Sequence, residues 1–113
     1  MAIERGTMSG PTLEEIRLRR AEILRVATEH GAANLRVFGS VARGEADADS
    51  DVDFLVDLQP ELLGFDYFAC RKQLSNELGA ILGHSVDVVR LRGPFSPQGE
   101  KMAAAIQREA MPL

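Results

Sequence analysis

Cysteine, tryptophan and long apolar runs are scarce or missing in this chain. Its 113 residues include one cysteine, Cys70, which cannot form a disulfide within the chain, and no tryptophan. No run of about 18 apolar residues is available to cross a membrane, and residues 1–11 lack the apolar segment of a secretory signal. We therefore expect a cytoplasmic protein that does not associate with membranes.

Basic residues are fewer than acidic residues, with 13 lysines and arginines against 17 aspartates and glutamates. The formal net charge is −4, and an acidic chain gains little from releasing the counterions of a nucleic acid. With 5 phenylalanines and 1 tyrosine, no aromatic platform for single strands is evident. We therefore do not expect nucleic acid as a partner, although a metal ion could mediate local binding of a nucleotide.

Hydrophobic spacing predicts one domain over residues 12–113, after a flexible lead at 1–11. Thr12 and Glu15 have the pattern of a capping box, which predicts a helix that runs to about His30. The other expected elements are strands at 35–38, 51–57 and 85–89, a helical turn at 41–43, a helix capped by Asp66 that ends at Gly83, and a last helix with Ser96 and Pro97 at its start that ends near Ala110, with breaks at Pro60 and Gly93-Pro94. This order predicts an α/β (α+β) domain with a small mixed sheet of about three to four strands and helices packed on it.

The turn Gly39-Ser40 follows the first expected strand and could hold a phosphate. Glycine lacks the Cβ atom that would block close approach to the backbone N–H groups, and the Ser40 hydroxyl adds a donor. An ordinary strand-to-helix turn with a serine cap has the same sequence, so this pair alone decides nothing. Arg43, in the helical turn that follows, could contact a phosphate or form a surface ion pair.

Asp51 and Asp53 place two carboxylates on one face of a strand, because residues i and i+2 project to the same side. Val52, Phe54 and Val56 would then face the core. Two adjacent like charges are unfavourable without a cation or solvent to compensate. Mg²⁺ prefers a few carboxylate oxygens together with water and substrate phosphate. The pattern therefore indicates a magnesium site, with a solvated strand end as the alternative.

Asp87 lies between two valines in an otherwise apolar strand, where a polar residue needs a partner. If this strand lies beside the preceding one, Asp87 could join Asp51 and Asp53 around metal, as in two-metal phosphoryl transfer. It could also accept the proton of an incoming hydroxyl as a general base. The alternative is a residue that faces water on an uncovered side of the sheet.

Taken together, these motifs resemble the signature of the DNA polymerase beta-like nucleotidyltransferase superfamily. The resemblance lies in Gly39-Ser40-x-Ala42-Arg43-Gly44, in the ten residues that separate Ser40 from Asp51-x-Asp53, and in the acidic strand around Asp87. It covers roughly residues 12–110. Within the superfamily the chain looks like the minimal nucleotidyltransferase (MNT) group, whose small members are commonly paired with a HEPN-domain ribonuclease toxin in toxin–antitoxin modules.

This resemblance implies an activity and a role for each motif residue. The MNT antitoxin is similar to an adenylyltransferase that moves AMP from ATP to a tyrosine of the toxin and so silences it. By that likeness Gly39 and Ser40, with Arg43 nearby, would hold the triphosphate, Asp51 and Asp53 would bind Mg²⁺, and Asp87 would complete the metal and catalytic site.

Two other functions stay open. The chain could be a non-catalytic antitoxin that neutralises its partner by occlusion, or a small-molecule, aminoglycoside-like nucleotidyltransferase that needs a second chain for its acceptor pocket. Larger relatives append a helical domain for the acceptor, and this chain has no room for one. We therefore expect a partner protein to supply the acceptor within a hetero-oligomer.

Overall fold

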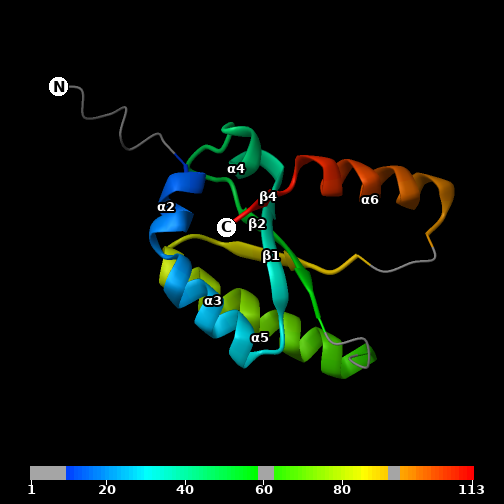
Figure 1. The fold of residues 1–113 in the computed structure, drawn as a ribbon, viewed down its shortest axis with the longest axis horizontal. Coiled ribbons are helices and arrows are strands. Elements are labelled where there is room, and N and C mark those ends of the chain that lie inside the picture. Colours follow the sequence, from blue (N-terminus) through cyan, green and yellow to red (C-terminus); the bar gives the residue numbers. More distant parts are fainter. Residues whose placement is uncertain (1–9, 59–62, 92–94) are drawn as a thin grey trace.

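The computed structural model describes residues 10–58, 63–91 and 95–113. In chain order its elements are α2 (Leu13–Leu18), α3 (Arg20–Glu29), β1 (Ala33–Phe38), α4 (Gly39–Arg43), β2 (Val52–Asp57), α5 (Gly64–Leu82), β3 (Val86–Val89), α6 (Pro97–Glu109) and β4 (Met111–Pro112). The strands form one mixed sheet in the order β3-β2-β1-β4, with helices packed around it (Figure 1). The predicted fold class is confirmed.

The sheet combines antiparallel and parallel pairs. β1 pairs antiparallel with both β2 and β4, whereas β2 pairs parallel with β3. A parallel pair needs a long crossover between its strands, and the 19-residue helix α5 supplies it. The crossover matters for function because it brings two strands that each carry an acidic residue into neighbouring positions.

The main core lies between the sheet and the helices α3 and α5, which run side by side in Figure 1. β2 shows the predicted alternation, since Val52, Phe54 and Val56 are all buried in this core. Phe38 and Leu55 are also buried, but they lie outside the core cluster, as expected for residues on the other face of the sheet. The acidic residues of the strands therefore belong to that second face.

The predicted first helix is interrupted. Thr12 caps it as expected, since its side-chain oxygen accepts a hydrogen bond from the Glu15 N–H at 3.1 Å. At Arg19, however, the backbone leaves the helical region (φ −101°, ψ 15°) and separates α2 from α3. Ile16 before the break and Ile23 after it are both fully buried. The prediction of a single helix from residue 12 to His30 was therefore wrong. No glycine or proline in the sequence indicates the break.

The other predicted helix ends are mostly confirmed. Ser96 caps α6 by accepting from the Gly99 N–H at 3.1 Å, and Gly83 ends α5 with a left-handed backbone. The predicted cap at Asp66 is wrong, because α5 begins earlier, with Leu63 at the N-cap position. Asp66 lies instead in the first turn, where its charge suits the helix dipole.

The ends of the chain add two features. Gly10 and Pro11 are buried, with Gly10 packed against the backbone of Asp47. The rest of the predicted lead and the predicted breaks at Pro60 and Gly93-Pro94 lie outside the described residues. Strand β4 was not predicted. Among the described residues, none of the helices combines the length and the hydropathy that a membrane span requires.

Candidate active site

The two acidic strands meet with their carboxylates at the same level. In the parallel pairing of β2 and β3, Asp53 is the direct partner of Asp87. On the antiparallel side, Asp53 pairs with Phe38, the last residue before the Gly39-Ser40 turn. The structure therefore brings the turn and both acidic strands to one place on the face of the sheet opposite the main core.

Asp53 is the centre of this acidic group. Burial and the nearby charges of Asp87, Asp51 and Glu109 raise its pKa from 3.8 to about 6, while Arg43 acts in the opposite direction. Burial is the largest cause, followed by Asp87. A half-buried carboxylate with acidic neighbours is the electrostatic environment that a cation relieves.

Asp87 has a cationic partner that sequence reasoning missed. Arg71 of α5 donates from Nη2 to the Asp87 Oδ1 atom at 2.8 Å and from Nε to the Val88 carbonyl at 2.6 Å. This carbonyl is accessible because β3 is an edge strand. Nothing in the sequence around Arg71 distinguishes it from other helix arginines, since its role depends on the packing of α5 against β3.

The Gly39-Ser40 turn lies directly against Asp53. Gly39 has a left-handed backbone (φ 75°), and a Cβ atom at this position would overlap the Asp53 Oδ2 atom. Glycine is thus required here for two reasons, its backbone angle and its lack of a side chain. Ser40 follows as the second residue of α4 and is half-buried.

Glu109, at the end of α6, occupies the donors of this turn. Its Oε2 atom accepts from the Gly39 N–H at 2.8 Å, and Arg43 Nη1 donates to its Oε1 atom at 3.0 Å. Arg43 also donates from Nε to Glu45 at 2.9 Å. The bond from Gly39, more than the bond from Arg43, lowers the pKa of Glu109. Of the two predicted possibilities for Arg43, the structure therefore shows ion pairs.

The described carboxylates near Asp53 do not form the three-ligand magnesium site that the sequence predicts. Among residues 10–58, 63–91 and 95–113, no three carboxylate, histidine or cysteine side chains stand together in an arrangement that could hold a metal ion. The three-ligand site of Asp51, Asp53 and Asp87 is thus not assembled in this structure, where Asp87 binds Arg71. Mg²⁺ commonly uses only one or two carboxylates and completes its shell with water and phosphate, and the charge around Asp53 fits such an ion.

Comparison with known proteins decides the family. A model of the nucleotidyltransferase domain matches residues 20–111. The chain belongs to the nucleotidyltransferase domain family. It is 43% identical over 81 residues to the protein adenylyltransferase MntA of Thermococcus cleftensis, an alignment that covers 69% of this chain and 76% of the relative. The predictions that it is a nucleotidyltransferase, and an enzyme, are confirmed.

Solved structures agree with this membership. A structure reported as a minimal nucleotidyltransferase has a TM-score of 0.72 and 40% identity, and the match covers 93% of this chain and 99% of the other. A toxin–antitoxin crystal structure with AMP-PNP has a TM-score of 0.54 and 20% identity, covering 79% of this chain and 90% of its own. The second likeness shows a shared fold only.

The contact between Gly39 and Asp53 predicts the effect of an alanine substitution. Gly39→Ala should lower the free energy of unfolding by about 2 kcal/mol, because the strain of a left-handed alanine adds to the cost of rotating the Asp53 carboxylate away from the new Cβ atom. Gly44→Ala is the matched control, since Gly44 has nearly the same backbone angle (φ 73°) but open space around a Cβ atom. It should cost only about 1 kcal/mol. Urea unfolding measures both, and equal losses would contradict the predicted overlap.

The raised pKa of Asp53 predicts a pH-dependent stability. Since the carboxyl has a pKa of about 6 in the folded state against an ordinary 3.8, its contribution to stability falls as the pH rises from about 4 to 6 and stays low above that. Without divalent cations, Asp53→Asn should therefore raise the melting temperature at pH 8 by about 2 to 6 °C. The gain should shrink at pH 4.

Asp57→Asn is the control for this effect. Asp57 lies on the same strand, but it is exposed and accepts a hydrogen bond from Arg36 at 3.3 Å. Its substitution should leave the melting temperature unchanged or lower it, because it removes an attraction. If the wild type and Asp53→Asn have the same melting temperature at pH 8, the ionised Asp53 carboxylate does not destabilise the fold.

Proposed function

We propose that the chain transfers AMP from Mg-ATP to a hydroxyl group of a partner protein. The acceptor is a tyrosine of a HEPN-type ribonuclease toxin, which the transfer neutralises, so the chain acts as an antitoxin in the cytoplasm. The observation that carries the proposal is the convergence of Asp53, Asp87 and the Gly39 turn on one face of the sheet. The relative MntA is a protein adenylyltransferase, and this supports the choice of AMP and of a protein acceptor.

Two groups of residues would bind the nucleotide, one through its phosphate oxygens and the other through magnesium. The Gly39 N–H, Ser40 and Arg43 would bind phosphate oxygens of ATP, because they are the hydrogen-bond donors beside the carboxylates. Asp51 and Asp53 would hold magnesium, which supplies positive charge to the triphosphate. The third ligand that the sequence predicts, Asp87, is held by Arg71 instead. The acidic cluster would otherwise repel ATP, so the donors alone do not suffice.

The transfer itself replaces a phosphoanhydride bond of ATP with a phosphoester bond to the acceptor. The acceptor oxygen bonds to the α-phosphorus of ATP, the bond from that phosphorus to the bridging oxygen breaks, and pyrophosphate leaves. The hydroxyl proton passes to Asp87, which we propose as the general base. The Arg71 guanidinium fixes the orientation of that carboxylate through the 2.8 Å bond to its Oδ1 atom.

A recess beside Asp87 is the place where we propose that the acceptor tyrosine binds. It has a volume of about 320 Å³ and is lined by Phe68, Arg71, Lys72, Ser75 and Asp87. Phe68 is 61% exposed, so its ring can contact another aromatic side chain. A tyrosine that enters from this side would bring its hydroxyl to Asp87, while the two cations would favour acidic residues around it.

The proposal predicts an AMP-sized mass gain on the co-purified partner that requires both ATP and magnesium. Asp51→Ala combined with Asp53→Ala should abolish it, because the metal loses two ligands, and intact-mass spectrometry of the complex is the measurement. Asp57→Ala is the control, since this exposed residue carries a charge on the same strand but at the far end. A double variant that still modifies the partner would refute the proposal.

The same variants separate catalysis from occlusion. If the double variant no longer modifies the toxin but neutralises its ribonuclease activity as well as the wild type does, binding alone is the mechanism. If the purified chain modifies an aminoglycoside without any partner, the small-molecule function is correct instead. Catalytic neutralisation predicts that the double variant fails in both assays, mass gain and protection from the toxin.

A further inference from the structure

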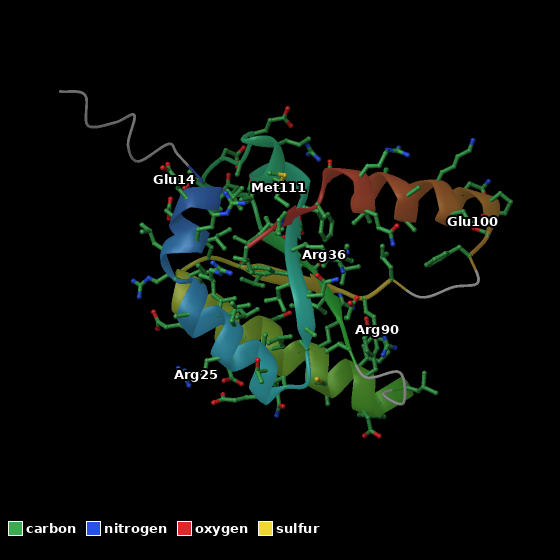
Figure 2. All side chains as sticks on the ribbon, in the orientation of Figure 1. Glu14, Arg25, Arg36, Arg90, Glu100 and Met111 are labelled. Atoms are coloured by element: carbon green, nitrogen blue, oxygen red, sulfur yellow. The ribbon has the colours of Figure 1, made fainter. Side chains whose placement is uncertain are left out.

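Glu109 is held in place by a strand that the sequence does not reveal. β4 pairs with β1 so that Met111 lies opposite Val37, and Glu109 lies two residues before Met111, at the end of α6. In Figure 2, Met111 lies beside β1, whereas Glu100, at the other end of α6, lies far from the body of the molecule. The position of Glu109 is thus set both by β4 and by the end of α6, which contacts α4 and β1.

The carboxylate of Glu109 has the chemistry of a phosphate oxygen pair. One of its oxygens accepts from the Gly39 N–H at 2.8 Å, and both accept from Arg43 Nη1, at 3.0 and 3.2 Å. Carboxylates and phosphates are both anionic acceptors that bind backbone N–H groups and guanidinium groups. The donors that Glu109 uses are therefore the same ones that the proposed function gives to the triphosphate.

We infer that Glu109 is an intramolecular competitor of the nucleotide and sets the affinity of the site for ATP. Its carboxylate takes the place of a phosphate group at Gly39 and Arg43 and must rotate away before the triphosphate can bind there. This inference rests on the proposed function. It adds that the resting site is closed by the chain's own acidic group.

Three features make this exchange feasible. The Glu109 side chain is 30% exposed, so it can rotate into solvent without moving α6 or β4. The Gly39 N–H is satisfied in both states, first by a carboxylate and then by phosphate, which avoids the penalty of an unpaired donor. Rotation also moves the negative charge of Glu109 away from Asp53, and this reduces the repulsion between the two carboxylates.

The test is the affinity of the purified chain for the magnesium complex of a non-hydrolysable ATP analogue, measured by isothermal titration calorimetry. Glu109→Ala removes the competing acceptor and should lower the Kd about fivefold, the size expected for one partly exposed charged contact. Glu109→Gln keeps the shape but loses the charge, and should lower the Kd less. Without ligand, both variants should melt at lower temperature than the wild type, because a bond to Gly39 is lost or weakened.

Glu45→Gln is the matched control. Glu45 also binds Arg43, at 2.9 Å, but its contact is with that side chain and it leaves the Gly39 donor to Glu109. Removing its charge should change the Kd by less than about twofold. If Glu45→Gln tightens binding as much as Glu109→Ala does, the effect is one of net charge and the inference is overturned.

Two further outcomes separate this inference from the function on which it rests. If the wild type binds the analogue and Glu109→Ala binds it equally or more weakly, Glu109 only anchors α6, and the inference fails while the proposed function stands. If no variant binds the analogue, both fail. The inference predicts that Glu109→Ala binds the analogue more tightly than the wild type and also melts at a lower temperature. A purely structural role for Glu109 would not produce this combination.

Discussion

The pairing of Asp53 with Asp87 at one level of a parallel strand pair is the constraint on which this site depends. Like charges directly opposite one another destabilise a sheet, and neither strand can relieve the repulsion by sliding. A slip of one residue would move Val52, Phe54 and Val88 out of the core, because side chains alternate between the two faces. The hydrophobic face thus fixes the acidic face, and the energy of the core maintains a group of carboxylates that would otherwise separate.

The surrounding residues reduce this repulsion only in part. Arg71 neutralises Asp87 from the edge of the sheet, and Gly39 leaves room for Asp53 without offering it a positive side chain. Asp53 therefore keeps a raised pKa. Strained, uncompensated charge of this kind is common where a protein trades stability for activity. In the proposed reaction this asymmetry between the two aspartates would leave Asp53 free to bind the cation, while Arg71 orients Asp87, the proposed general base.

Much of this arrangement can be predicted from the sequence because its signals are local. The alternation of Val52 to Val56, the glycine that ends α5 and the Ser96 cap each depend on neighbouring residues only. The spacing of the Gly39 turn from the aspartate pair, together with the acidic strand around Asp87, was enough to indicate the nucleotidyltransferase family. These features specify the strands, several helix ends and the residues proposed for the site, but they do not specify which side chains lie against one another.

What could not be predicted depends on register between distant parts of the chain. β4 has only the residues Met111–Pro112 and shows no alternation, so nothing in its sequence indicates a strand. The contacts of Glu109 with Gly39 and of Arg71 with Asp87 span 70 and 16 residues, respectively. The break at Arg19 likewise has no local signal, since no glycine or proline stands there. Tertiary contacts of this kind override local propensity.

The contact of Glu109 also explains how an acidic site can exist before its ligand binds. A phosphate-binding turn exposes N–H groups that need an acceptor at all times, and solvent alone would leave the Gly39 turn less well ordered. In this structure the Glu109 carboxylate accepts the hydrogen bond of the Gly39 N–H and also holds Arg43 beside the turn. In the proposed reaction the nucleotide would exchange one anion for another and would not have to order the turn itself. Affinity is lower than for an empty turn, but the binding geometry is already formed, and pre-formed geometry reduces the entropy lost on binding.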